Sequence, residues 1–101
     1  MKLPVVWIPE AESDLADAAA WYASIGPDLG ERFSQVVGQT IELIARNPLA
    51  WQVIHKQIRR AGLWRFPYGI FFRVETDRIV VIACMHGRRN PKRWRVRGSA
   101  G

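Results

Sequence analysis

The sequence predicts an α+β domain: an N-terminal strand and an antiparallel helical hairpin packed on a small twisted antiparallel β-sheet, in the order β-α-α-β-β-β. Three observations support this fold class. Apolar residues recur at helical spacing between residues 9 and 46. A glycine-proline pair at 26–27 interrupts that pattern once and divides it into two helices. After Pro48 the apolar residues alternate with a period of two, as they do in strands.

The length of 101 residues fits one domain with a modest core. We expect this domain to span residues 1–97, and residues 98–101 (GSAG) to form a disordered tail. The composition is 49% hydrophobic with five tryptophans, which is too apolar for a disordered protein. No apolar run approaches the roughly 20 residues of a membrane span, and there is one cysteine. We therefore expect a cytoplasmic protein without a membrane partner or a disulfide.

The first strand is predicted at residues 2–8 (KLPVVWI), a β-branched and aromatic run in which Pro4 suits an edge or a strand start. Pro9 then suits the first turn of a helix, and the acids that follow it complement the positive N-terminal end of that helix. Gly26 ends the helix. Its apolar face consists of Ala11, Leu15, Ala18 and Tyr22.

The second helix begins at Pro27 and ends at the Asn47-Pro48 pair, with Arg46 in its last turn. Only a tight turn separates it from the first helix, so the two should form an antiparallel hairpin. No polar groups converge on its apolar stripe, which favours a core over a cofactor site. The stripe consists of Leu29, Phe33, Val36, Val37, Thr40, Ile41 and Ile44.

Three strands are predicted in the second half, at residues 58–66, 68–75 and 78–86. The middle strand alternates, with Tyr68, Ile70, Phe72 and Val74 on one face and Phe71, Arg73 and Glu75 on the other. Residues 76–77 suit a short hairpin turn. The last strand is apolar on both faces, which predicts a central position in the sheet. Together these strands form an antiparallel meander.

The net charge of +6 conceals two halves of opposite sign. Residues 1–50 carry three basic groups and seven acids, a net of −4, whereas residues 51–101 carry twelve basic groups and two acids, a net of +10. This asymmetry favours an acidic or polyanionic partner for the second half. A basic face that is merely solvated is the alternative.

Arginine supplies most of this charge, ten residues against two lysines in the second half. Five arginines fall on the predicted sheet, and residues 86–97 (HGRRNPKRWRVR) add six basic groups around one tryptophan. Guanidinium groups bind carboxylate or phosphate bidentately and stack on aromatic rings. Charge alone does not decide between an acidic peptide and single-stranded RNA. The sheet arginines are Arg59, Arg60, Arg65, Arg73 and Arg78.

The sequence predicts neither a metal site nor a cofactor. His55 and His86 lie far apart, no carboxylates cluster in the second half, and no glycine-rich phosphate loop occurs. Cys84 and His86 are two residues apart on one strand, but no third group would orient the histidine. Because Cys84 lies in an apolar run, we interpret it as a buried, unreactive thiol.

His86 is the remaining candidate for proton transfer near neutral pH. RNA cleavage through the 2′-hydroxyl needs a base, an acid and cations around the phosphate. His86 with Arg65, Arg73 and Arg88 would supply such groups. A histidine at a strand end that only bonds to backbone is the alternative.

Several segments together resemble the RelE/ParE superfamily, the toxins of bacterial type II toxin–antitoxin modules. They are PEAESDLADAAAWY (9–22), TIELIARNP (40–48) and the continuous stretch 59–94. Its most specific parts are RFPYGIFFR (65–73) and HGRRNP with Trp94. The resemblance covers about residues 5–95 and is greatest to the ParE branch, which is linked to plasmid stabilization.

The resemblance implies the fold derived above and a cognate antitoxin partner, whose acidic, otherwise disordered C-terminal arm folds on the toxin. It implies contact with DNA only indirectly, through that antitoxin. RelE-type members cleave messenger RNA on the ribosome, whereas ParE-type members inhibit DNA gyrase. A binding module that has lost its target activity is a third possibility.

One position separates the two branches. RelE-type nucleases carry an arginine where this chain has Gly69. They also have two basic positions on the preceding strand, where this chain has Arg60 and Gly62. The arginine of their last strand is matched by Arg89. The resemblance thus favours gyrase inhibition and no catalytic residue. The predicted antitoxin-binding residues are Arg59, Arg60, Arg65 and Arg73. The predicted target-binding residues are Arg88, Arg89, Lys92, Arg93 and Trp94. A nuclease would instead use His86, Arg65, Arg73 and Arg89.

Overall fold

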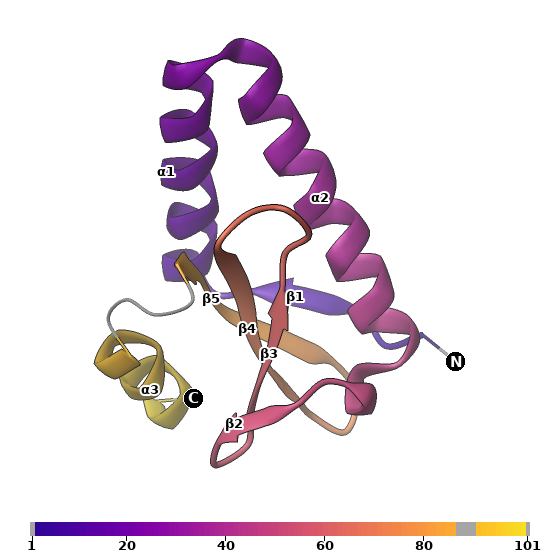
Figure 1. Cartoon of the computed structure of the whole chain (residues 1–101). Coiled ribbons are helices and arrows are strands. Elements are labelled where there is room, and N and C mark those ends of the chain that lie inside the picture. The colour runs from indigo at the N-terminus through magenta and orange to yellow at the C-terminus, as the bar shows by residue number, and fades with distance from the viewer. Residues whose placement is uncertain (1, 87–90, 101) are drawn as a thin grey trace.

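A helical hairpin covers one face of a five-stranded sheet, and a short C-terminal helix lies on the opposite side (Figure 1). The computed structural model describes residues 2–86 and 91–100. None of its described helices is long and apolar enough to cross a membrane. The elements are β1 (Val5–Trp7), α1 (Pro9–Ile25), α2 (Pro27–Arg46), the 3₁₀ turn η1 (Pro48–Ala50), β2 (Val53–His55), β3 (Ile58–Gly62), β4 (Tyr68–Val74), β5 (Ile79–His86) and α3 (Pro91–Ala100).

The strand order is β1-β5-β4-β3-β2, which confirms the predicted α+β fold class and the β3-β4-β5 meander. As predicted, β5 is an interior strand, and every residue from Ile79 to Met85 is buried. The sheet is mixed rather than wholly antiparallel, because β1 pairs with β5 in parallel, Val5 opposite Ile79. The three-residue strand β2, which pairs with β3, was not predicted.

The hairpin has the predicted boundaries. Proline occupies the start of both α1 and α2, and Gly26 in an extended conformation separates them. Phe33 is fully buried between the rings of Tyr22, Phe66 and Tyr68, at centroid distances of 5.0, 5.1 and 5.4 Å. These contacts join the hairpin to β4 and to the loop before it, so the apolar stripe is core, as predicted.

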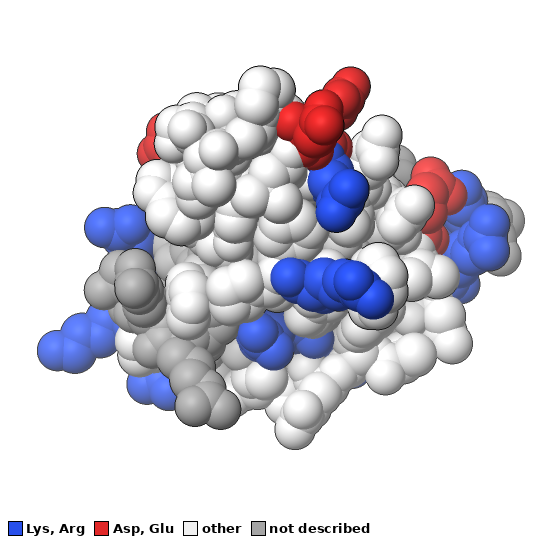
Figure 2. All heavy atoms as spheres, turned by 45° about the horizontal axis from the view of Figure 1, so that its top comes forward, with Lys and Arg blue, Asp and Glu red and all other residues white. Residues whose placement is uncertain are grey.

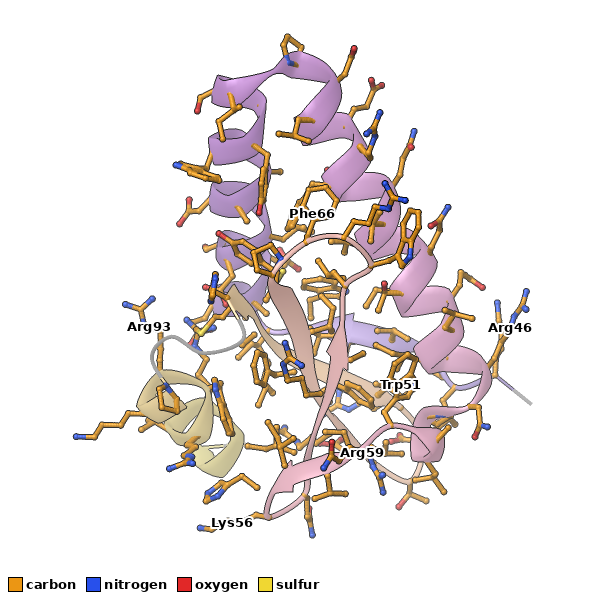
Figure 3. All side chains as sticks on the ribbon, viewed as in Figure 1. Arg46, Trp51, Lys56, Arg59, Phe66 and Arg93 are labelled. Atoms are coloured by element: carbon orange, nitrogen blue, oxygen red, sulfur yellow. The ribbon has the colours of Figure 1, made fainter. Side chains whose placement is uncertain are left out.

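The predicted strand at 58–66 is too long. β3 ends at Gly62, and residues 63–67 form a loop that the Leu63 N–H closes by donating to the Tyr68 carbonyl at 2.9 Å. Arg65 has a φ of 66°, which is incompatible with a strand. In Figure 3 the loop reaches the hairpin, with Phe66 directed between α1 and α2.

The second face of the sheet has its own apolar cluster, which α3 covers. The Trp94 ring stacks on Phe71 with centroids 5.0 Å apart. The helix continues through residues 98–100, where the sequence predicted a disordered tail. A β-carbon at Gly98 would lie 2.3 Å from the Ile58 Cδ1, so the missing side chain allows this part of α3 to lie close to β3.

Candidate partner-binding surface

Basic side chains lie over the middle and at both sides of the face in Figure 2, and acidic side chains lie along its upper and outer margins. This view agrees with the charge separation in the sequence, because the hairpin belongs to the acidic half and the sheet and α3 to the basic half. The predicted basic residues nevertheless occupy very different environments.

Two predicted antitoxin-binding arginines have structural partners within the chain. The Arg59 Nη1 donates to the Trp51 carbonyl at 2.6 Å, and Figure 3 shows the two residues side by side. The Arg73 Nε donates to Glu75 at 2.9 Å, and its side chain is 12% exposed. Hydrogen bonds from Arg78 and then Arg73 lower the pKa of Glu75. A partner would compete with these contacts to bind Arg59 or Arg73.

Arg60 lies on the sheet face that α3 partly covers. Its side chain runs over Gly62 and Gly69, which are directly paired across β3 and β4. Its guanidinium carbon lies 6.0 Å from the centre of the Phe71 ring. The Nε atom is buried without a hydrogen-bond partner. Arg60 is therefore fixed mainly by shape and by its aromatic neighbour.

Arg65 is the exposed member of the predicted set. Its guanidinium carbon lies 4.4 Å from the centre of the Trp64 ring, and Trp64 is 68% exposed. Trp64 was not among the residues predicted to form a site. The available signal was a tryptophan next to an arginine at the end of an alternating pattern.

Of the predicted target-binding residues, Arg88 and Arg89 lie outside the described residues. Lys92 and Arg93 are exposed on α3, and Figure 3 shows Arg93 projecting from it. Trp94 is 5% exposed. Because its ring is buried on Phe71, we correct its assignment: Trp94 holds α3 on the sheet and presents no ring surface to a target in this conformation.

Arg97 and Asp14 fasten α3 to α1 and β5, a contact that the sequence did not indicate. Arg97 Nη1 donates to Asp14 at 2.6 Å and to the Ile82 carbonyl at 3.1 Å. Asp14 also accepts the backbone N–H of Cys84 at 3.1 Å. β1 pairs only with residues 79–81 of β5. The two side chains thus satisfy backbone groups of β5 beyond the end of β1.

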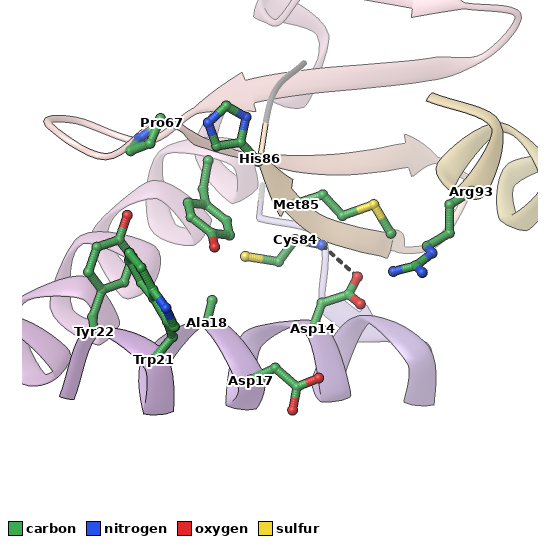
Figure 4. Close-up of a pocket in the computed structure, with 11 residues that line it drawn as sticks. Asp14, Asp17, Ala18, Trp21, Tyr22, Pro67, Cys84, Met85, His86 and Arg93 are labelled. Atoms are coloured by element: carbon green, nitrogen blue, oxygen red, sulfur yellow. Dashed lines mark hydrogen bonds between the residues drawn. The ribbon is translucent and has the colours of Figure 1, made fainter. Parts of the chain in front are cut away.

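A pocket of about 560 Å³ lies between α1 and the end of β5 (Figure 4). His86 lies at one side of it, with its ring centroid 6.0 Å from that of Tyr68. The residues that line it are Asp14, Asp17, Ala18, Trp21, Tyr22, Pro67, Tyr68, Cys84, Met85, His86 and Arg93.

Among the described nuclease candidates, Arg73 and His86 are not brought together. Tyr68 pairs with His86 and Arg73 with Val80, so His86 and Arg73 are separated by five positions of β4. That separation is about 17 Å along the strand. Arg73 lines a pocket with Gly98 of α3, whereas His86 borders the pocket beside α1. Arg65 is on the loop that precedes β4, and Arg89 is outside the described residues.

Burial, followed by the charge of Asp14, raises the pKa of the Cys84 thiol to about 12. The thiol therefore stays protonated at physiological pH, in agreement with its interpretation as unreactive. Within residues 2–86 and 91–100, no group of three or more histidine, cysteine, aspartate or glutamate side chains is arranged to hold a metal ion.

The architecture defines a small α+β protein in which a helical hairpin covers one face of a five-stranded sheet and basic residues lie on the sheet and on α3. Residues 5–91 match the family model described as the ParE toxin of the type II toxin–antitoxin system parDE. The chain belongs to this ParE toxin family.

Individual relatives agree with this assignment. Toxin ParE2 of Mycobacterium tuberculosis, in strains H37Rv and CDC 1551, is 31% identical over 81 residues, which cover 79% of this chain and 77% of the relative. The fold is similar to a chain of the chromosomal ParDE system from P. aeruginosa, with a TM-score of 0.74 at 19% identity over 84% of this chain and 96% of that one. It is also similar to a chain of the M. tuberculosis toxin–antitoxin complex RelBE2, with a TM-score of 0.58 at 16% identity over 85% and 99% of the two chains.

Proposed function

We propose that this toxin is neutralised by a cognate antitoxin with an acidic arm, and that it acts by inhibiting DNA gyrase in the cytoplasm. The main support is the concentration of positive charge, a net of +10, in the half of the chain that supplies β2 to β5 and α3. An acidic arm would neutralise this charge while apolar contacts add affinity. The solved ParDE and RelBE2 assemblies support a partner of this kind.

The antitoxin-binding residues in this proposal remain Arg59, Arg60, Arg65 and Arg73, with Arg65 the most accessible. Co-expression with the reading frame next to the toxin gene tests the partner. We expect a stable complex that the Arg65→Ala, Arg73→Ala double variant weakens and that salt dissociates only partly. Unchanged affinity of the double variant would contradict this choice of residues.

Arg88, Arg89, Lys92 and Arg93 remain the proposed target-binding residues. Gyrase inhibition is favoured over RNA cleavage because two residues that a nuclease would use, His86 and Arg73, lie at opposite ends of the paired strands β4 and β5. Gly69 also stands where the resemblance places an arginine in the nuclease branch, and loss of one such charge-stabilising donor lowers catalytic rates by roughly 10²–10³.

The purified toxin distinguishes the two targets in parallel assays. We expect inhibition in a gyrase supercoiling assay, and its loss in an Arg88→Ala, Arg89→Ala variant that still binds the antitoxin. The second assay maps messenger RNA ends after translation on ribosomes. Codon-specific cleavage that His86→Ala abolishes would instead establish a RelE-type nuclease.

A further inference from the structure

Residues 63–67 form a short loop on which Trp64 and Arg65 are exposed to solvent. Leu63 is 7% exposed, and its N–H closes the loop on Tyr68. Phe66 packs edge to face on Tyr22 at 4.9 Å and on Phe33 at 5.1 Å. Residues on both sides of Trp64 and Arg65 are therefore fixed to the core, while these two point outward.

The backbone at Arg65 is strained. Its φ of 66° lies in the left-handed region, which side chains other than glycine and asparagine rarely adopt. Conformations of this kind are retained where the surrounding structure enforces them, often at functional sites. Here the left-handed residue places a guanidinium over the neighbouring indole ring.

The pair combines two residue types that carry a large share of binding energy at protein interfaces. A guanidinium that stacks on a ring directs its N–H groups outward in its own plane, where a carboxylate can accept two of them. Trp64 adds a large apolar surface next to that carboxylate site, and the fixed loop reduces the entropy lost on binding.

The surrounding charge favours a short acidic segment over a nucleic acid. The loop contacts the helical hairpin, and residues 1–50 carry a net charge of −4. A nucleic acid brings a phosphate with every nucleotide, whereas a protein segment can place one carboxylate at Arg65 and an apolar side chain on Trp64 and so carry less charge past the hairpin.

We propose that Trp64 and Arg65 form a preformed anchor for an acidic segment of a partner protein. Arg65 binds a carboxylate of that segment, and Trp64 packs on the apolar side chain next to it. The inference deepens the proposed function and rests on it in one respect: the segment is assigned to the antitoxin arm. Trp64 is the residue that this inference adds to the proposed antitoxin-binding residues.

The test uses protein labelled with 5-fluorotryptophan and observed by fluorine NMR. Trp64→Phe identifies the Trp64 signal among those of the five tryptophans. The probe is a synthetic peptide rich in glutamate and leucine. We expect the Trp64 signal to shift during titration, and Trp64→Ala and Arg65→Asn each to weaken binding about tenfold or more. Asparagine tolerates the left-handed backbone, so Arg65→Asn removes the charge without refolding the loop.

Two matched controls come from the same chain. Trp21→Ala removes a tryptophan that is 57% exposed on α1, and Arg46→Ala removes an exposed cation at the end of α2. Both should bind the peptide within about twofold of the unaltered protein.

The inference is overturned if the peptide does not bind, if both loop variants bind it as well as the unaltered protein does, or if a single-stranded oligonucleotide shifts the Trp64 signal at lower concentration than the peptide. Failure of the antitoxin assignment is a separate result: the peptide binds at Trp64, while the co-expressed neighbouring gene product forms no complex.

Discussion

The Arg60 side chain lies directly over Gly69. A β-carbon at position 69 would be 2.7 Å from the Arg60 Nε, so only glycine fits there without a shift of Arg60. The resemblance to the nuclease branch had suggested that Gly69 leaves a place without a guanidinium. In the structure the Arg60 side chain passes over Gly69 from the paired strand β3, and the interpretation of Gly69 as a missing catalytic cation stays a prediction.

Gly69→Ala should destabilise the protein by about 1–3 kcal/mol, because the methyl group must displace the Arg60 side chain from its packed position. Urea unfolding measures this loss. In an Arg60→Ala background the same change should be nearly neutral, since the conflicting side chain is absent. An equal loss of unfolding free energy in both backgrounds would mean that contact with Arg60 is not the reason why position 69 requires glycine.

Phe33→Ala should destabilise the domain by about 3–5 kcal/mol, because it removes the ring that contacts Tyr22, Phe66 and Tyr68. The denaturation midpoint is the measurement. Ser34→Ala, at the next and exposed position of α2, is the control and should change the midpoint little. An unchanged midpoint for Phe33→Ala would contradict the described core.

Asp14→Asn should destabilise the protein by about 3 kcal/mol, because it leaves the Arg97 charge without its carboxylate in a site where both side chains are less than 15% exposed. A double-mutant cycle with Arg97→Met isolates the pair, and Asp17→Asn, on the exposed side of α1, is the control. A coupling energy near zero would show that the ion pair does not hold α3.

Cys84 should react with iodoacetamide at pH 8 only after denaturation. Its folded-state pKa of about 12 lies above the usual value, so the thiolate is nearly absent in the native protein at that pH, and burial also blocks access. Mass spectrometry of protein labelled with and without urea measures the difference. Rapid labelling of the native protein would contradict the buried position.

The hairpin was predictable because its information is local. Pro9, Gly26 and Pro27 mark helix ends, and the spacing around Phe33 fixes the buried face. β2 is too short to show alternation, and α3 is polar apart from Trp94 and Val96, so neither has a clear local pattern.

The sequence predicted the charge of the proposed binding surface but not the environment of each of its residues. The sequence grouped Arg59, Arg65 and Arg73 together, but their environments depend on distant or irregular structure: the Trp51 carbonyl for Arg59 and a left-handed backbone for Arg65. Asp14 and Arg97, 83 residues apart, had no sequence pattern that would pair them.

The parallel pairing of β1 with β5 also determines when this domain can fold during its synthesis. Val5 pairs with Ile79, 74 positions later. Such long-range contacts slow folding, because a large loop must close before any pairing energy is gained. The ribosome must release β5 before β1 has a partner, so we expect the nascent chain to acquire its complete sheet, and with it the surface proposed to bind the antitoxin, only after β5 has emerged.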